Sequence, residues 1–306
     1  ILDGESGRVF EIVDGTDTSL HIIGFTITAS NGGGNDGSCQ NGGGAVVKVK
    51  WANESYDNNT NQWGGTPSGV TFKKCVFKIF DSIDAAAAGD TGLEGDEWKD
   101  VAVDCGSLGT GIAVFDDCEF TNITVDHAIL NNQDGGGVIR VGYIGGGPEG
   151  TAFGIARFNR SKITGITVKK NMDGTSAVRG GVMLMGHSAN NDVKLINTIV
   201  ADNILYDNNS NGAQGGVFNM TNAGDLQLIN CTVVNNKIIT NFSWGSGSVI
   251  FADDYNNDGY APHFTVFNSI IHSNTITINA GTSSESQSQI NQFHLTESND
   301  GTEVYA

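Results

Sequence analysis

A short phrase recurs along the chain: "VKLINTIVADN" begins at Val193, and "LQLINCTVVNN" begins at Leu226. Its pattern is apolar-x-apolar-x-x-small-x-apolar, and its centres are Phe25, Cys75, Cys118, Ser161, Thr198, Cys231 and Ser269. Successive centres are separated by 33–50 residues. Self-similarity at such a period is typical of repeat proteins, in which each repeat buries its apolar face only against its neighbours.

Three positions of the phrase are apolar in every copy. Five residues before the centre stand Leu20, Val70, Ala113, Ala156, Val193, Leu226 and Phe264. Three residues before it stand Ile22, Phe72, Phe115, Phe158, Leu195, Leu228 and Val266. Two residues after it stand Ile27, Phe77, Phe120, Ile163, Val200, Val233 and Ile271. Val193 and Leu195 alternate with period 2, as do Thr198 and Val200, and the parity slips by one between the two pairs. Each phrase is therefore predicted to be two short strands joined by a tight bend.

A glycine-rich phrase precedes most of these cores. It reads "GGGAVVKV" at Gly42, "GGGVIRV" at Gly135, "GGVMLM" at Gly180, "GGVFNM" at Gly215 and "GSVIF" at Gly247. We interpret it as a third strand in each repeat. Three strands per repeat, stacked about 4.8 Å apart, predict an all-β solenoid with a continuous core.

The repeated core phrase, as in "INCTVVNN", and the glycine-rich strands resemble the right-handed parallel β-helix proteins of the pectate-lyase-like superfamily. The resemblance is greatest to its bacterial secreted and cell-surface repeat proteins. The resemblance covers nearly the whole chain. It implies one domain over residues 1–306, a single right-handed parallel β-helix of about seven three-strand coils, with loop insertions along one edge. It does not specify the function, because this fold hosts lyases, hydrolases, adhesins and stalks.

Both ends of the chain lack an evident capping helix. Open solenoid ends expose unpaired strand edges. We therefore expect a fragment of a longer solenoid, or end-to-end self-association in which another subunit covers each edge.

Three asparagines, Asn203, Asn236 and Asn274, follow their cores at one shared offset. We expect their side chains to point inward, to stack, and to satisfy backbone groups at the bends, since buried polar groups need hydrogen-bond partners.

The five cysteines fall into two groups. Cys75, Cys118 and Cys231 stand in the centre column beside Ser and Thr, and we interpret them as small core residues. Cys39 and Cys105 lie off that column, and the sequence leaves open whether a disulfide joins them. No C-x-x-C pair occurs, which argues against a structural zinc site.

The formal net charge of −18 argues against partners that are nucleic acids or anionic membranes. No apolar run reaches the length of about 18 residues that a membrane-spanning helix requires. We expect an extracellular or bacterial cell-surface location without membrane insertion.

Three insertions break the repeat at one topological position, between the glycine strand and the core phrase. They cover residues 51–69, 142–154 and 252–263. Their aromatic residues are the predicted binding residues: Trp51, Tyr56, Trp63, Tyr143, Tyr255 and Tyr260. Aromatic rings on exposed loops stack against sugar rings and are favoured at recognition surfaces. The competing interpretation is that these rings fold back over the flank of the solenoid.

The third insertion contains "DYNNDG", the first half of a calcium-binding loop, with Asp254, Asn256 and Asp258 as candidate ligands. The closing acid is absent, since Thr265 stands at the twelfth position. "DNNSNG", beginning at Asp207, has the same pattern and also lacks a closing acid. The alternative is an ordinary turn rich in Asp and Asn.

No intact catalytic motif is present. Asp116–Asp117 and Asp253–Asp254 are paired carboxylates of the kind that glycosidases use. In β-helix hydrolases similar to polygalacturonase such a pair accompanies G-H-G and R-I-K motifs, and here only "MGHS" with His187 echoes the first. We therefore interpret Asp116–Asp117 as a solvated bend.

Two functions compete. The one we favour is a secreted or cell-surface, non-catalytic protein with an adhesive, matrix or filament role, which binds polysaccharide or a surface protein through the aromatic insertions. The alternative is a calcium-assisted polysaccharide lyase or glycoside hydrolase acting on acidic polysaccharide, with a lyase base among Lys48, Lys50 and Arg140. A third interpretation is a structural spacer that binds nothing through its insertions.

Overall fold

The computed structural model is built from β-strands. It describes residues 1–3, 10–12, 20–28, 47–49, 52–57, 62–66, 68–78, 103–105, 111–126, 138–142, 154–170, 178–186, 191–207, 213–221, 224–241, 247–253, 262–278, 286–288, 293–295 and 304–305, some of them by backbone alone. No helix occurs in these ranges. Every strand pairing within them is parallel except β6 with β7 and β31 with β32.

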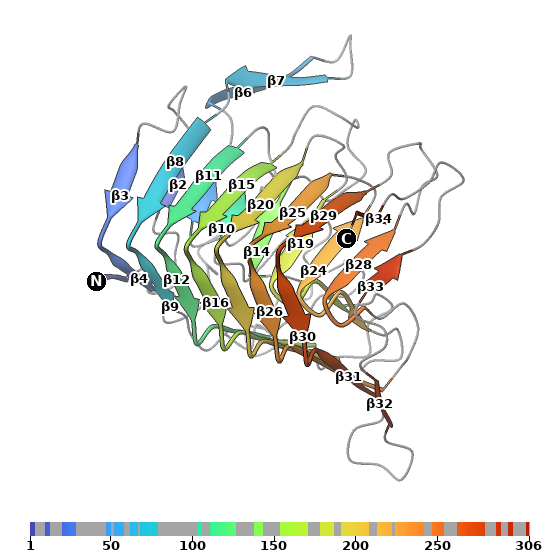
Figure 1. Cartoon of the computed structure of the whole chain (residues 1–306). Helices are drawn as coiled ribbons and strands as arrows, with labels where there is room; N and C mark the ends of the chain where they lie inside the picture. The colour runs from blue at the N-terminus through green and yellow to red at the C-terminus, as the bar shows by residue number, and fades with distance from the viewer. Residues whose placement is uncertain are drawn as a thin grey trace, which may run out of the picture.

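Four stacked sheets contain most of the strands, and we number the sheets in the order in which the chain visits them from β2 onward (Figure 1). Sheet 1 contains β2 (Phe10–Ile12), β5 (Val47–Val49), β10 (Val103–Cys105), β14 (Ile139–Val141), β19 (Met183–Met185), β24 (Phe218–Thr221), β28 (Ile250–Asp253) and β33 (Phe293–Leu295). Sheet 2 contains β3 (His21–Ile23), β8 (Ser68–Lys73), β11 (Gly111–Asp116), β15 (Gly154–Asn159), β20 (Asp192–Ile196), β25 (Asp225–Ile229), β29 (His263–Phe267) and β34 (Val304–Tyr305).

Sheet 3 contains β1 (Leu2–Asp3), β4 (Thr26–Thr28), β9 (Val76–Lys78), β12 (Glu119–Thr121), β16 (Lys162–Thr164), β21 (Ile199–Ala201), β26 (Thr232–Val234) and β30 (Ile270–His272). Sheet 4 contains β13 (Thr124–Asp126), β17 (Thr167–Lys170), β22 (Ile204–Asp207), β27 (Lys237–Thr240), β31 (Thr275–Ile278) and β32 (Ser286–Ser288). Two further strand pairs are β6 (Ala52–Asp57) with β7 (Gln62–Thr66), and β18 (Val178–Arg179) with β23 (Ala213–Gln214).

We call the strands that visit the sheets once in turn, such as β14 to β17, a rung. Neighbouring rungs pair in register, so that Phe115 lies opposite Phe158, Phe158 opposite Leu195, and Leu195 opposite Leu228. The predicted apolar columns are therefore aligned across the sheets. The prediction of an all-β fold is confirmed, and parallel strands in stacked sheets are compatible with a parallel β-solenoid.

Each repeat was predicted to contain three strands, but the rungs from β11 onward add a fourth, in sheet 4. After β16 the chain bends a second time at Gly165, which has a φ of +66°, and Ile166 then turns inward ahead of β17. Among the residues whose burial the structure describes, β17 and β22 each contribute one buried apolar residue, Val168 and Leu205, so the apolar pattern of this short strand is weak in the sequence.

The centre column is confirmed as a line of small inward side chains. The backbone N–H of Cys118 donates to Oγ of Ser161 at 3.1 Å, and that of Cys231 donates to Oγ of Ser269 at 2.9 Å. Each hydroxyl also donates to a carbonyl of the preceding rung, as Ser161 does to Phe115 O at 3.0 Å. Phe25 is the exception: its ring is too large for this position, and it is exposed.

The predicted asparagine ladder is also confirmed. Oδ1 of Asn236 accepts from the backbone N–H of Asn203 at 3.2 Å and from Nδ2 of the same residue at 2.8 Å. Asn274 repeats this arrangement beneath Asn236, at 3.0 and 2.9 Å. All three residues are completely buried, and they supply hydrogen bonds to backbone groups at the second bend of each rung.

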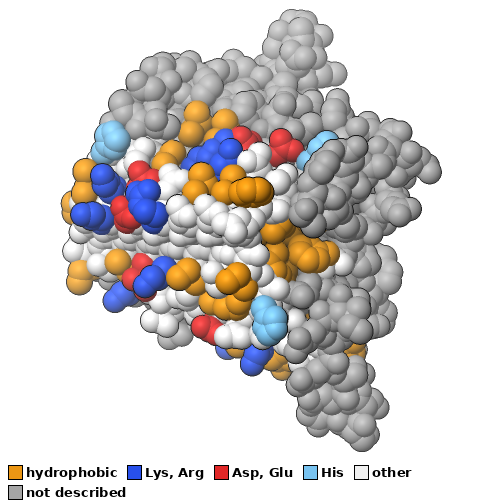
Figure 2. All heavy atoms as spheres, viewed as in Figure 1, with side chains coloured by type: hydrophobic (Ala, Val, Ile, Leu, Met, Phe, Trp, Pro, Cys, Tyr) orange, Lys and Arg blue, Asp and Glu red, His pale blue; other side chains and the backbone are white. Residues whose placement is uncertain are grey.

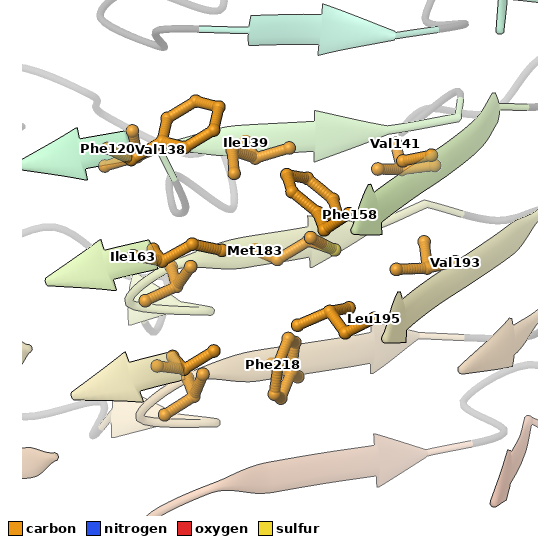
Figure 3. Packing of buried hydrophobic residues seen from close by; sticks show 14 of the residues in the cluster. Phe120, Val138, Ile139, Val141, Phe158, Ile163, Met183, Val193, Leu195 and Phe218 are labelled. Atoms are coloured by element: carbon orange, nitrogen blue, oxygen red, sulfur yellow. The ribbon is translucent and has the colours of Figure 1, made fainter. Parts of the chain in front are cut away.

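Apart from the centre column and the asparagine ladder, the interior between the sheets is mostly apolar in the described rungs. Figure 3 shows Phe158 and Leu195 from sheet 2 projecting into the same interior as Met183 and Phe218 from sheet 1. In the earlier rungs phenylalanines fill the space, as where the rings of Phe115 and Phe158 stack at 4.7 Å. One predicted inward position fails: Leu20, at the start of the first column, is exposed.

Candidate binding surface

The aromatic insertions are described only in part. Tyr56 and Trp63 lie opposite each other on the antiparallel hairpin β6–β7, which projects beyond the stacked sheets (Figure 1). Trp51, Tyr143, Tyr255 and Tyr260 lie outside the described residues. The insertions do share one topological position, because each connects a strand of sheet 1 to the next strand of sheet 2. The binding role of these six aromatic residues stays a prediction.

The predicted calcium ligands Asp254, Asn256 and Asp258 also lie outside the described residues. Asp207, the first residue of the second candidate loop, ends β22 and is buried. Within the part of the chain that the structure describes, no group of three or more His, Cys, Asp or Glu side chains could hold a metal ion.

The described surface with the most distinctive chemistry is the bend between sheets 2 and 3, which we call the corner. In each rung it consists of the residue that ends the sheet 2 strand, a residue with positive φ, and the first residue of the sheet 3 strand. The positive-φ residues are Gly24, Lys74, Asp117, Arg160, Asn197, Asn230 and Asn268. Their φ values lie between +47° and +76°, the left-handed region in which Gly, Asn and Asp are favoured.

Three consecutive rungs carry charged residues at the corner. They contribute Lys73, Lys74 and Val76, then Asp116, Asp117 and Glu119, then Asn159, Arg160 and Lys162. Arg160 Nε donates to Asp117 Oδ1 at 2.7 Å, and Asn159 Nδ2 donates to Asp116 Oδ1 at 2.7 Å. The sign of the charge therefore alternates from rung to rung, and opposite charges face each other in the ladder.

Asp116 and Asp117 are one of the paired carboxylates in the sequence, and the environment of Asp117 does not suit a general acid. The hydrogen bond from Arg160, together with its positive charge, lowers the pKa of Asp117 below the ordinary value. A general acid instead requires a raised pKa. The interpretation of this pair as a solvated bend agrees with the ion pair to the neighbouring rung.

The next three rungs carry no charge at the same positions. We call these nine residues the uncharged strip: Ile196, Asn197, Ile199, Ile229, Asn230, Thr232, Phe267, Asn268 and Ile270. Phe267 is 65% exposed, Ile270 61% and Ile199 40%. Asn268 Nδ2 donates to Asn230 Oδ1 at 2.7 Å. A row of amides thus runs along the corner between two rows rich in aliphatic and aromatic side chains.

Figure 2 shows this division on one face of the molecule. At the corner, Lys, Arg, Asp and Glu side chains gather over the rungs of β8, β11 and β15, and hydrophobic side chains over those of β20, β25 and β29. Nearer the start of the sheet 2 strands, the later rungs also carry charged side chains, at Asp192, Lys194 and Asp225. Sequence reasoning missed the strip because it followed the inward columns. The signal was present at the outward position one residue before each centre, which changes from charged to uncharged between Arg160 and Asn197.

Two of the three candidate lyase bases, Lys48 and Arg140, lie on sheet 1. Lys48 and Arg140 are in register with Asp104, which lies between them in the ladder. The structure describes only the backbone of these residues, and Lys50 and His187 lie outside the described ranges. A catalytic role for Lys48, Lys50 or Arg140 stays a prediction.

No protein-family model, curated protein or solved structure matches this chain. Among the described residues, no helix is both long enough and apolar enough to cross a membrane.

Proposed function

We propose that the chain is a non-catalytic binding protein of the extracellular space or bacterial cell surface, with an adhesive, matrix or filament role. We propose further that residues 1–306 form a single right-handed parallel β-helix of about seven coils, similar to the pectate-lyase-like superfamily. The stacked parallel sheets and the in-register ladders support this architecture.

The observation that carries the proposal is the uncharged strip. A polysaccharide of neutral sugars presents apolar C–H faces and equatorial hydroxyl groups. Phe267 and Ile270 offer exposed apolar surface for the former, and Asn230 and Asn268 offer amide donors and acceptors for the latter. The chain carries a net charge of −18, yet these nine positions carry none, which favours a neutral ligand over a polyanion or polycation.

The strip also has the form of a site for an extended chain. Its residues repeat from rung to rung, at the strand spacing of about 4.8 Å, along the stacking direction. We propose that a neutral polysaccharide lies along it, and that the aromatic insertions supply further contacts. Calcium in the "DYNNDG" loop would stiffen the third insertion, and end-to-end association of subunits would extend the surface. A surface protein is the competing partner.

The experiment is a pull-down on insoluble cellulose and chitin, with mannan as a further neutral ligand and pectin as the polyanionic comparison. The double variant Phe267→Ser/Ile270→Ser is expected to lose about tenfold or more in affinity, the usual effect of removing buried anchors at an interface. Ile23→Ser is the matched control, because Ile23 occupies the same position as Phe267 in the first rung and is 56% exposed. Equal losses in both variants, or binding unchanged in the double variant, would contradict the proposal.

The second candidate function is a polysaccharide lyase, because Lys48, Asp104 and Arg140 lie in register on sheet 1. Alginate and pectin are therefore incubated with the protein in calcium and in chelator, and new unsaturated ends are measured. Calcium-dependent cleavage that is lost in Arg140→Ala would replace the binding proposal with this one.

A further inference from the structure

Cys75 and Cys118 stand next to each other in the centre column, in two neighbouring rungs. Their sulfur atoms are buried, at 0% and 2% exposure, and neither is in a disulfide. Cys231 occupies the same column, but its neighbours there are Thr198 and Ser269. Among the described centre positions, Cys75 and Cys118 therefore form an adjacent pair of thiols, and Cys231 is an internal comparison.

The backbone holds the two cysteines in register. Lys73 and Val76, on either side of Cys75, lie opposite Asp116 and Glu119, on either side of Cys118. Backbone hydrogen bonds of 2.9 Å from Lys74 N to Asp116 O and from Glu119 N to Cys75 O fix this alignment. Strands so paired are about 4.8 Å apart, which lies within the Cα separation of about 4.4–6.8 Å found in disulfides.

The thiols also point into the same interior. Sγ of Cys118 donates to the carbonyl of Phe72 at 3.4 Å, so it reaches toward the rung that contains Cys75. Sγ of Cys75 donates to Ile22 O at 3.3 Å, one rung further on. Closing an S–S bond therefore needs a rotation of the Cys75 side chain, with no change in the pairing of the strands.

We propose that Cys75 and Cys118 are a redox-active pair that closes to an inter-rung disulfide by exchange with a low-molecular-weight disulfide. The thiolate of Cys75 attacks one sulfur of the external disulfide, and the other sulfur leaves as a small thiol after taking up a proton. Cys118 then loses its proton and attacks the Cys75 sulfur of the mixed disulfide, which expels the second small thiol. Two cysteine thiols are oxidised, and one external disulfide is reduced to two thiols.

The electrostatics of the pair support this order of attack. The neighbouring Cys118 thiol lowers the pKa of Cys75, and the same interaction together with burial raises the pKa of Cys118. Burial alone raises the pKa of Cys231, which has no neighbouring thiol. Because both sulfurs are buried, the exchange takes place during folding or during local opening of the rungs.

The test uses the full chain with Cys39→Ser and Cys105→Ser, so that Cys75, Cys118 and Cys231 remain. The protein is refolded, and separately incubated in the folded state, in a buffer of oxidised and reduced glutathione. It is then quenched in acid, unfolded, alkylated with N-ethylmaleimide and digested with trypsin. We expect peptide 75–78 to be joined to peptide 100–140, with the loss of two hydrogen atoms, and Cys231 to be alkylated.

Two variants make the result specific. Cys118→Ser is expected to fold, since Ser161 and Ser269 occupy the same column, and to leave Cys75 alkylated or glutathionylated without a cross-link. Thr198→Cys places a second thiol beside Cys231 and is expected to create a second cross-link. The oxidised parent should also unfold at a higher urea concentration than the reduced parent.

The proposal is overturned if the folded parent, verified by circular dichroism, returns Cys75 and Cys118 fully alkylated after both redox treatments. It is equally overturned if either residue is cross-linked to Cys231, because the register would then be wrong. A cross-link in Thr198→Cys without one in the parent would show that the column permits the bond and that this pair does not form it.

Discussion

The two halves of the corner share one backbone geometry but present different side chains to solvent. In the rungs of β8, β11 and β15 the positive-φ residues are Lys74, Asp117 and Arg160, whereas in those of β20, β25 and β29 all three are asparagines. In both halves the side chain of the inward centre residue at the bend donates a hydrogen bond to a backbone carbonyl. The comparison teaches that the fold requires the bend and the inward column, while the outward positions are free to acquire different chemistry.

The interiors of the two halves differ as well. In the first half, ring stacking and edge contacts between phenylalanines fill the core, as for Phe115 with Phe72 at 5.4 Å and with Phe120 at 5.2 Å. In the second half aliphatic residues replace most rings, and a buried amide ladder replaces the isoleucines at the second bend, Ile123 and Ile166. The stability of the first half therefore depends on close packing of apolar side chains, and that of the second half depends also on directional hydrogen bonds.

The largest effect should come from Phe115→Ala, which removes a ring in contact with four other phenylalanines. We expect the free energy of unfolding to fall by about 3–5 kcal/mol. Leu228→Ala, at the same column position in the second half, should cost less by about 1 kcal/mol, because no ring stacking is lost there. Urea unfolding followed by two optical probes measures both, and equal losses would remove the distinction between the two cores.

Asn236→Ala should destabilise the protein by about 2–4 kcal/mol. It leaves the backbone N–H of Asn203 and the carbonyl of Val200 without their buried partners. The control is Asn230→Gly in the same rung, where the side chain is exposed and the positive φ suits glycine, with an expected change within about 0.5 kcal/mol. Similar unfolding midpoints for the two variants would show that the ladder adds little to stability.

Sequence patterns were sufficient to predict most of the inward-facing positions of the fold. The columns around Phe115, the small centre position and the stacked amides of Asn236 follow from repetition, because every rung must satisfy the same interior. The fourth strand was missed because one buried residue, such as Val168, is too little to reveal a period. Phe25 and Leu20 were placed inward by their columns, yet both are exposed.

The outward surface was harder to predict, since nothing in the interior constrains it. The strip around Phe267 becomes recognisable only when the bend fixes which positions face solvent together. The aromatic insertions depart from the repeat, so periodicity gives no constraint on their conformation. The roles of Trp51 and Tyr255, and of Asp254 in calcium binding, accordingly stay predictions.

A smaller effect of opposite sign is expected at Lys74. Its φ of +52° is unfavourable for a long side chain, so Lys74→Gly should raise the free energy of unfolding by about 0.5–1 kcal/mol. Asn197→Gly, at the equivalent position in the uncharged half, should change it little, because asparagine already tolerates this region. The difference between the two midpoints is the measurement. A loss of stability in Lys74→Gly would mean that the charge of Lys74 matters more than its backbone strain.

The smallest expected effect concerns the charge ladder itself. The hydrogen bond from Arg160 lowers the pKa of Asp117 in the folded protein, whereas the unfolded carboxyl titrates near its ordinary value of about 3.9. A depressed folded pKa contributes stability that is fully present above the unfolded pKa and is lost as the pH falls through the folded one. Carbon-detected NMR titration should therefore place Asp117 below 3.9 in the parent, and closer to it in Arg160→Gln or at high salt.

Asn230→Asp is the matched test of this charge ladder, because it introduces a carboxyl at the same corner position between Asn197 and Asn268, which carry no charge. Its pKa should lie closer to the ordinary value than that of Asp117. If both carboxyls titrate alike, the bend and not the alternation of charge sets the pKa, and the two halves of the corner are electrostatically equivalent. If they differ as expected, the charged residues of the neighbouring rung lower the pKa of Asp117, and the strip lacks such charges.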